Sequence, residues 1–293
     1  MRDQMVKTVE DLLAQEERLV LLLANVGTSL FENAFHTYPQ RALDLGILEQ
    51  TMTSVAAGMA LEGFIPVLHT IAPFLIERPF EQIKDDFCYQ RLGGNFISIG
   101  ASYDYSTEGM THQGSGDVQI LKSLPGMQIV VPGTPKEFDG LFREAYANGS
   151  PTYYRLSTRT NTANTSVQFG KLSVLKQGEL ATIIAIGPML TSVLSAVADM
   201  DVTILYCTTV APFDAETLRL SSQSNNIIVV EPYYTGTLVP DISVAMRHIP
   251  TRIEAIGIPH DLLTYYGTPR QHDEAIGLTP HHIRARIQRF LSE

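Results

Sequence analysis

The stretch Leu19-Val20-Leu21-Leu22-Leu23-Ala24 is a run of six apolar residues between the charged Arg18 and the polar Asn25. Both alternating faces of such a run are apolar, as they are in strands of a parallel sheet that helices cover on both sides. Three more short apolar runs follow, at residues 65–69, 96–100 and 129–131. We therefore predict a parallel sheet in the first half of the chain.

The segments between these runs have helical patterns. From Gln50 to Glu62, apolar residues recur at spacings of three and four, which predicts a helix with one buried face. Gly63 follows, and glycine is common where helices end. Thr134-Pro135 predicts a second helix, with a threonine cap and proline at its first position, that extends to about residue 147.

The second half of the chain repeats the alternation of strands and helices. Strands are predicted at 181–187, 202–206 and 226–230, and helices at 188–200 and from Thr279-Pro280 onward. Between the halves, residues 157–171 are polar without an apolar period, which is typical of a connection over the surface. The whole pattern predicts an α/β fold of two doubly wound domains, which we place at residues 1–160 and 170–293.

Composition narrows the range of functions. The 293 residues include 21 Lys and Arg against 31 Asp and Glu, a formal charge of −10, so a nucleic-acid partner is not expected. The two cysteines, Cys88 and Cys207, form neither a disulfide framework nor a metal cluster in sequence. No apolar run is long enough for a membrane span, and no signal-peptide pattern is present. We expect no membrane partner and a cytoplasmic protein.

Three segments at predicted strand ends have unusual compositions. Residues 42–50 combine a glycine with a glutamate at a helix start, residues 108–117 hold Glu, His, Gln and Ser among glycines, and residues 70–80 hold aromatic residues beside Arg78. In open α/β sheets, ligands bind at such strand ends. Taken singly, each segment also fits an ordinary helix start, an exposed loop or a core aromatic. Their order along the chain is more informative than any one of them.

That order resembles the transketolase family, which uses thiamine diphosphate. The matching segments are, in order, Gly46-Ile47-Leu48-Glu49-Gln50, Ala56-Ala57-Gly58, Thr70 to Phe74, Gly109-Met110-Thr111-His112-Gln113, Leu124-Pro125-Gly126 and Val130-Val131-Pro132. The resemblance covers residues 19–156, the family's pyrimidine-binding domain, and continues more weakly through residues 170–293, which resemble its C-terminal domain.

The resemblance implies roles for particular residues. Glu49 matches the family glutamate that hydrogen-bonds the N1′ atom of the cofactor and promotes loss of the thiazolium C2 proton, and Phe74 matches the aromatic residue that stacks on the aminopyrimidine. Ile47 and Arg78 are expected beside the cofactor, and His112 in catalysis. The expected substrate-binding residues are Asn25, His69, Tyr103, Glu108, His112 and one of Arg155 and Arg159.

Two departures from the family shape the prediction. Tyr103 stands where sugar-using members often have a histidine, so ordinary pentose phosphates are in doubt. The Gly-Asp-Gly segment, followed 25 to 30 residues later by asparagine, that holds the diphosphate and its metal in the family does not occur. We therefore expect no metal site in this chain. The pyrophosphate-binding subunit, with Mg²⁺ or Ca²⁺, is expected to be a separate chain in an α₂β₂ assembly.

Three functions remain open from the sequence. The first is two-carbon ketol transfer between a sugar or sugar phosphate and an aldehyde. The second is a reaction of a 2-oxo acid, as in deoxyxylulose-phosphate synthase or the β subunit of a 2-oxo acid dehydrogenase; Thr111-His112-Gln113 disfavours the dehydrogenase. The third is a binding module without activity, which has no need of Glu49, Phe74 and His112 together.

Overall fold

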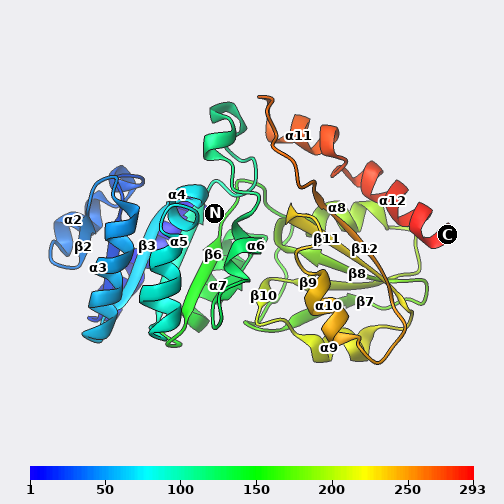
Figure 1. Cartoon of the computed structure of the whole chain (residues 1–293), viewed down its shortest axis with the longest axis horizontal. Helices are drawn as coiled ribbons and strands as arrows, with labels where there is room; N and C mark the ends of the chain where they lie inside the picture. The colour runs from blue at the N-terminus through cyan, green and yellow to red at the C-terminus, as the bar shows by residue number, and fades with distance from the viewer.

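Two parallel-rich sheets stand side by side in the structure, a computed structural model that describes residues 1–293 (Figure 1). The first sheet has seven strands in the order β10-β5-β6-β4-β3-β1-β2, and only β10 runs antiparallel to its neighbour. The strands are β1 (Leu19–Leu23), β2 (Ala42–Asp44), β3 (Ile65–Ile71), β4 (Gly94–Ile99), β5 (Gln128–Val130), β6 (Pro151–Arg155) and β10 (Thr209–Ala211).

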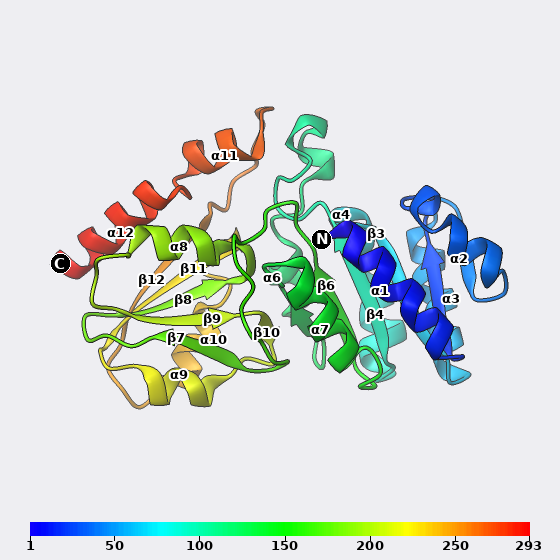
Figure 2. The same cartoon turned by 180° about the vertical axis from the view of Figure 1, so that it is seen from behind.

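Strand β1 shows how helices come to cover both faces of this sheet. Val20 and Leu22 belong to one core cluster, together with residues of helix α3 (Glu49–Leu61) and α4 (Ala72–Ile76). Leu19 and Leu21 belong to another cluster, with residues of α1 (Arg2–Gln15) and α7 (Pro135–Ala145). Figure 1 shows α3 in front of the sheet, and Figure 2 shows α1 and α7 on the opposite face. The predicted doubly wound α/β arrangement is confirmed.

The second sheet has five strands in the order β12-β11-β8-β9-β7, with β7 antiparallel at its edge. Helices α8 and α12 pack on one face, and α9 and α10 pack on the other. These elements are β7 (Leu172–Lys176), β8 (Thr182–Ile186), β9 (Thr203–Cys207), β11 (Asn226–Tyr234), β12 (Arg252–Ile258), α8 (Leu190–Ala196), α9 (Ala215–Ser221), α10 (Val239–Ala245) and α12 (Pro280–Ser292).

The two sheets are joined by more than the connection between them. Residues 156–171 contain no helix or strand, as the polar composition predicts. Strand β10, from the C-terminal half, pairs with β5 and completes the first sheet. At the same junction, Glu137 Oε2 accepts hydrogen bonds from the Gly133 amide and the Tyr206 hydroxyl. The two halves therefore share a sheet and a buried polar contact.

Some elements differ from the sequence-based expectations. Helix α1 was not predicted, although its buried Met5, Val9 and Leu12 recur at spacings of four and three, as in a helix with one buried face. The helix predicted over 188–200 is a 3-10 turn, η5 (Gly187–Met189), followed by α8, which ends at Ala196. Thr279 makes no capping bond to the backbone of α12; its hydroxyl pairs with the Nδ1 atom of His282.

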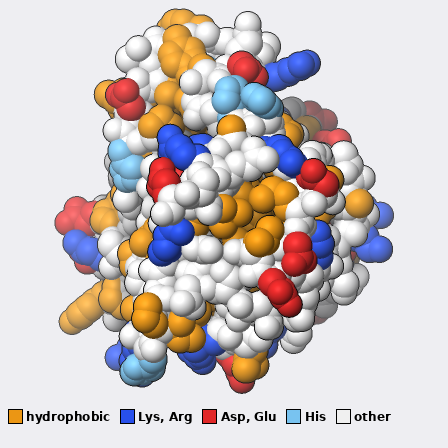
Figure 3. Space-filling model, turned by 90° about the vertical axis from the view of Figure 1, so that its right-hand side faces the viewer, with side chains coloured by type: hydrophobic (Ala, Val, Ile, Leu, Met, Phe, Trp, Pro, Cys, Tyr) orange, Lys and Arg blue, Asp and Glu red, His pale blue; other side chains and the backbone are white.

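The surface and the helix lengths add two observations. No helix of this structure is both long enough and apolar enough to cross a lipid bilayer. Figure 3 shows the end of the molecule formed by the C-terminal half, where hydrophobic side chains gather in a central patch and charged side chains of both signs surround it.

Candidate functional site

Glu49 is placed by the turn between β2 and α3. The Asp44 carboxylate at the end of β2 accepts hydrogen bonds from the Asn25 amide at 2.8 Å and the Gly46 amide at 3.1 Å. It thereby ties the end of β1 to this turn. Glu49 is the first residue of α3 and only 3% exposed. The two preceding residues, Ile47 and Leu48, are 65% and 54% exposed. A buried carboxylate thus directly follows two exposed apolar residues in the chain.

Arg78 connects Glu49 to Phe74. Its Nη1 atom donates a 2.8 Å hydrogen bond to Glu49 Oε1, and its Cζ atom lies 3.9 Å from the centroid of the Phe74 ring. Phe74 is on α4, and Arg78 follows that helix in the turn before α5 (Phe80–Gln82). The guanidinium therefore bridges an aromatic face and a buried carboxylate.

His112 approaches the same aromatic ring from the loop after β4. It ends the 3-10 turn η4 (Met110–His112), and its ring meets Phe74 edge to face with centroids 5.1 Å apart. Its Nδ1 atom is 2.9 Å from the Thr111 hydroxyl. Next to it, Gln113 is buried with no hydrogen-bond partner for either amide atom. The structure thus brings together four of the predicted residues: Glu49, Phe74, Arg78 and His112.

The C-terminal half packs against the loop that carries His112. In Figures 1 and 2 the segment before α11 (Pro269–Ile276) rises beside this loop. The Ser106 hydroxyl donates to the Gly267 carbonyl, and a Cβ atom on Gly109 would lie 3.0 Å from the Tyr266 ring. The loop therefore depends on both halves of the chain for its position.

Arg155 lies inside the protein rather than at a surface. Its side chain is 1% exposed; Nε donates a 2.7 Å hydrogen bond to Asp117 Oδ2, and Nη2 donates to Gly114 O and Ser102 Oγ. Arg159, by contrast, lines a cavity. Of the two arginines left open by the sequence, Arg159 is the one that lines this cavity.

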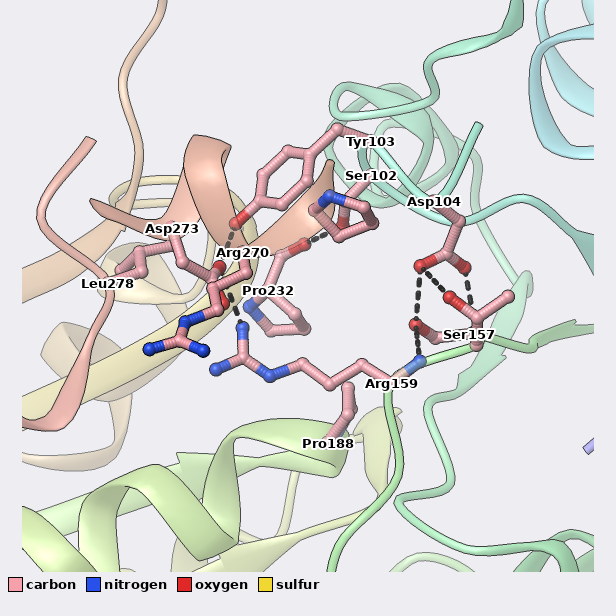
Figure 4. Close-up of a pocket in the computed structure, with 12 residues that line it drawn as sticks. Ser102, Tyr103, Asp104, Ser157, Arg159, Pro188, Pro232, Arg270, Asp273 and Leu278 are labelled. Carbon is pink, nitrogen blue, oxygen red and sulfur yellow. Dashed lines mark hydrogen bonds and ion pairs between the residues drawn. The ribbon is translucent and has the colours of Figure 1, made fainter. Parts of the chain in front are cut away.

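That cavity lies between the two halves of the chain and has a volume of about 280 Å³ (Figure 4). Arg159 Nη1 donates to Asp273 Oδ1 at 3.0 Å, and the Tyr103 hydroxyl donates to the same carboxylate. Asp104 accepts hydrogen bonds from Ser157 and Thr158, and burial raises the pKa of its carboxyl. Arg270 completes the charged lining.

The remaining predicted residues lie apart from this arrangement or at its exposed edge. His69 is fully buried; its Nδ1 atom is 2.8 Å from the Ile97 carbonyl, and burial lowers its pKa to about 4. Because a carbonyl oxygen only accepts, Nδ1 carries the proton. Asn25 is exposed with φ of +65° after β1, and Glu108 is exposed on η3 (Ser106–Glu108). His69 therefore belongs to the core between the sheet and Phe31.

Two residues at the site were not predicted from the sequence. The structural importance of Asp44 was not predicted, because it becomes visible only in the hydrogen bonds that its carboxylate accepts from Asn25 and Gly46. Asp273 was missed because it is 170 residues from Tyr103 in the chain. The start of its helix was nevertheless visible: Thr268 and Gln271 form a capping box around Pro269, a pattern that can be recognised in sequence.

No group of three or more His, Cys, Asp or Glu side chains is arranged to hold a metal ion.

Comparison with known proteins identifies the family. A family model of the transketolase pyrimidine binding domain matches residues 1–163, and one of the transketolase C-terminal domain matches residues 170–283. The chain belongs to the transketolase family. The predicted resemblance is thereby confirmed, and family membership implies thiamine diphosphate as the cofactor.

Several transketolase-family and related proteins are similar to this chain over most of its length. An uncharacterized 33.6 kDa protein in the fasciation locus of Rhodococcoides fascians is 38% identical, covering 97% of this chain and 92% of that protein. The 6-deoxy-6-sulfo-D-fructose transketolase subunit SqwH of Clostridium sp. (strain MSTE9) is 28% identical, covering 78% and 74%. The 1-deoxy-D-xylulose-5-phosphate synthase of Desulforudis audaxviator is 26% identical over 93% of this chain, which spans 45% of that synthase.

Among solved structures, a split gene transketolase described as an inactive beta4 tetramer superposes with a TM-score of 0.88 at 25% identity. The match covers 99% of this chain and 97% of that chain. This transketolase-family chain therefore matches the fold of that split gene transketolase over nearly the full length of both chains.

Proposed function

We propose that this chain is the pyrimidine-binding subunit of a two-chain, thiamine-diphosphate-dependent transketolase. In this proposal, the enzyme moves a two-carbon ketol unit from a sugar-type donor to an aldehyde acceptor in the cytoplasm. A separate subunit holds the diphosphate and its Mg²⁺ or Ca²⁺, in an α₂β₂ assembly. The observation that carries the proposal is the arrangement of Glu49, Phe74 and Arg78.

The arrangement fits an aminopyrimidine. The Arg78 guanidinium is a planar hydrogen-bond donor, and it fits between the Phe74 ring at 3.9 Å and the Glu49 carboxylate at 2.8 Å. An aminopyrimidine is also planar and needs an aromatic face and a carboxyl partner. Stacking on Phe74 would fix the plane of its ring. The space that accepts one planar group therefore suits the other.

The chain's own residues would each perform a distinct task. When bound, the cofactor supplies the nucleophilic carbon that attacks a carbonyl group and accepts the resulting negative charge. Glu49 would hydrogen-bond the N1′ atom and hold or release a proton there. Phe74 would orient the pyrimidine and exclude water from it, with Ile47 beside it. His112, against Phe74, would reach the substrate side and exchange protons with a sugar hydroxyl.

The substrate would enter past the loop that carries Glu108 and His112. Glu108 is exposed there and is available for a sugar hydroxyl. Arg159, in the cavity between the halves, is the candidate for a phosphate or other anionic group on the substrate, since a guanidinium binds such groups bidentately. Tyr103, in place of a family histidine, supports a substrate other than an ordinary pentose phosphate.

The similarity to a transketolase subunit and to a split gene transketolase supports a separate partner chain. So do the exposed Ile47 and Leu48, which lie next to the buried carboxylate and are suited to cover by another subunit. We expect the isolated chain to bind thiamine diphosphate weakly. Tight, metal-dependent binding to the isolated chain, measured by calorimetry, would contradict the two-chain arrangement.

Reconstitution tests the activity. The chain is mixed with a candidate pyrophosphate-binding subunit, thiamine diphosphate, Mg²⁺, an aldehyde acceptor and ketose donors with and without a phosphate. Mass spectrometry should then detect a sugar two carbons longer than the acceptor. Glu49→Gln should abolish this product, while Glu62→Gln, at the exposed C-terminal end of the same helix, should not. Full activity of Glu49→Gln would refute the proposal.

A reaction of a 2-oxo acid is the second candidate, favoured by the similarity to the 1-deoxy-D-xylulose-5-phosphate synthase. The same reconstituted complex distinguishes the two, because a 2-oxo acid donor such as pyruvate releases carbon dioxide and a ketose donor does not. A binding module without activity would give neither product.

A further inference from the structure

Arg78 makes the two contacts that the proposed function assigns to the aminopyrimidine. It lies over the face of Phe74 and donates to the carboxylate of Glu49. We propose that Arg78 closes the cofactor site of the unassembled chain by occupying the position of the pyrimidine ring, and that it must leave for the cofactor to bind. This inference rests on the proposed function and adds a means of regulating the same site.

Burial shows that the two occupants exclude each other. With the Arg78 guanidinium in place, the Glu49 side chain is only 4% exposed. Phe74 is contacted by Arg78 over its face and by His112 edge to face. A planar ring therefore cannot reach Glu49 Oε1 and stack on this face of Phe74 until the guanidinium moves away.

The contact has a physical reason in the free chain. A buried carboxylate without a partner is unfavourable, because it has lost its hydration and gained nothing in return. Arg78 supplies the missing charge and donor. When a pyrimidine ring replaces it, a proton shared between the N1′ atom and Glu49 makes the new hydrogen bond, so the carboxyl group is paired in both states.

Arg78 is also placed so that it can leave. Its side chain is 43% exposed, whereas that of its partner is almost wholly buried. It follows α4 in the turn between two short helices, so no long helix holds its backbone. The aliphatic part of the side chain can carry the guanidinium into solvent without displacing the core.

The experiment uses the isolated full-length chain and a probe that needs no partner subunit. The probe is 4-amino-5-hydroxymethyl-2-methylpyrimidine, which has the aminopyrimidine ring and lacks the diphosphate. With arginine labelled by ¹³C and ¹⁵N, the Arg78 signals should be shifted by the Phe74 ring current, and Phe74→Leu should abolish that shift. Saturating probe should move the same signals to the positions of an exposed arginine.

Affinity for the probe gives the second measurement. Apparent affinity falls with the fraction of molecules in which the site is closed, so Arg78→Ala should tighten probe binding about three- to tenfold. Arg78→Lys keeps a cation near Glu49 without a planar group, so its affinity for the probe should lie between those of the unaltered chain and Arg78→Ala. The matched control Arg219→Ala, at an exposed position on α9, should bind like the unaltered chain.

The outcomes separate this inference from the proposed function. Weaker or unchanged probe binding by Arg78→Ala would overturn the closing function of Arg78 and leave the cofactor assignment standing. The same holds if the probe binds while the Arg78 signals stay in place. Absence of binding to every variant, with an intact fold shown by circular dichroism, would overturn both.

Discussion

Arg155 and Asp117 form an ion pair with a separation of 2.7 Å between Nε and Oδ2, and their side chains are 1% and 0% exposed. The Tyr153 hydroxyl donates to the same carboxylate oxygen at 2.7 Å. The pair joins the end of β6 to α6 (Asp117–Leu121) beneath the loop of residues 102–114. The arginine of the Tyr154-Arg155 segment therefore supports that loop from below.

Replacing Arg155 should mainly affect stability. Arg155→Met leaves the Asp117 carboxylate buried with no cation, and breaking a buried pair by removing one partner costs about 3–5 kcal/mol. Urea denaturation followed by circular dichroism measures this change in the free energy of unfolding. Arg159→Met is the matched comparison, because Arg159 is partly exposed in the cavity, and it should lower stability by less than about 1 kcal/mol. Equal losses for the two variants would contradict this assignment.

The Glu49–Arg78 pair predicts a measurable coupling in the free chain. Arg78→Ala and Glu49→Gln should each change the free energy of unfolding, and the double variant should cost less than their sum. We expect a coupling of about 1–2 kcal/mol, below that of a fully buried pair because the guanidinium is 43% exposed. Denaturation of the four proteins completes the cycle. Strict additivity would mean that the pair has no energetic importance in solution.

His112 is expected to act on the substrate more than on the cofactor. In the reconstituted enzyme, His112→Ala should raise the KM for the donor or lower kcat by about 10²–10⁴, the usual contribution of a proton-transferring side chain. Cofactor affinity should change less than threefold, since Glu49 and Phe74 remain. His281→Ala, on the exposed side of α12, is the control. Equal losses in substrate and cofactor binding would contradict this division of function.

The sequence was sufficient to predict strands β1, β3, β4 and β5 of the first sheet and the helix that begins at Glu49, for local reasons. Runs such as residues 19–24 are short and apolar on both faces, which is typical of strands in a parallel sheet that helices cover. The start of α3 at Glu49 follows from Gly46 and the periodic apolar residues after it. These signals lie within a few residues of the features they predict.

Features that depend on distant partners could not be predicted in this way. Nothing near Arg155 in sequence indicates that it forms an ion pair with Asp117. The Tyr103 hydroxyl donates to Asp273, which belongs to the other half of the chain. Likewise, β10 is a three-residue strand, and its place in the first sheet is decided by how the two halves pack together. Propensity and periodicity are local, whereas these contacts are decided by the tertiary fold.

His69 makes stability depend on pH in a defined direction. Burial lowers its pKa to about 4, against an ordinary value of 6.5, so the folded state holds the ring neutral. The unfolded chain therefore binds more protons between these values, and the contribution of His69 to stability is complete above pH 6.5 and lost as pH falls toward 4. The loss should approach about 3 kcal/mol.

His69→Asn isolates this effect, because the asparagine amide can still donate to the Ile97 carbonyl. The difference in unfolding free energy between the unaltered chain and the variant should be largest at pH 8 and shrink toward pH 4. Urea denaturation at four or five pH values measures it. A difference that stays constant with pH would show that His69 titrates normally.

Replacing Gly133 should destabilise the junction between the two halves more than any other single change considered. A Cβ atom at this position would lie 2.0 Å from Asn161 Nδ2, 2.2 Å from the Tyr206 hydroxyl and 2.8 Å from the Gly187 carbonyl oxygen. Gly133→Ala must therefore push β9 and the connection away from the first half. Overpacking of this kind costs about 1–3 kcal/mol, and here it also disturbs the hydrogen bonds to Glu137.

Gly140→Ala is the same chemical change, but it should stabilise the chain instead of destabilising it. Gly140 lies within α7, and a Cβ atom there would meet nothing within 4 Å. Since glycine is about 1 kcal/mol less favourable than alanine inside a helix, Gly140→Ala should stabilise the chain by up to that amount. Thermal unfolding should move down for Gly133→Ala and up for Gly140→Ala. If Gly133→Ala also moved thermal unfolding upward, the close packing of the two halves at Gly133 would not exist in solution.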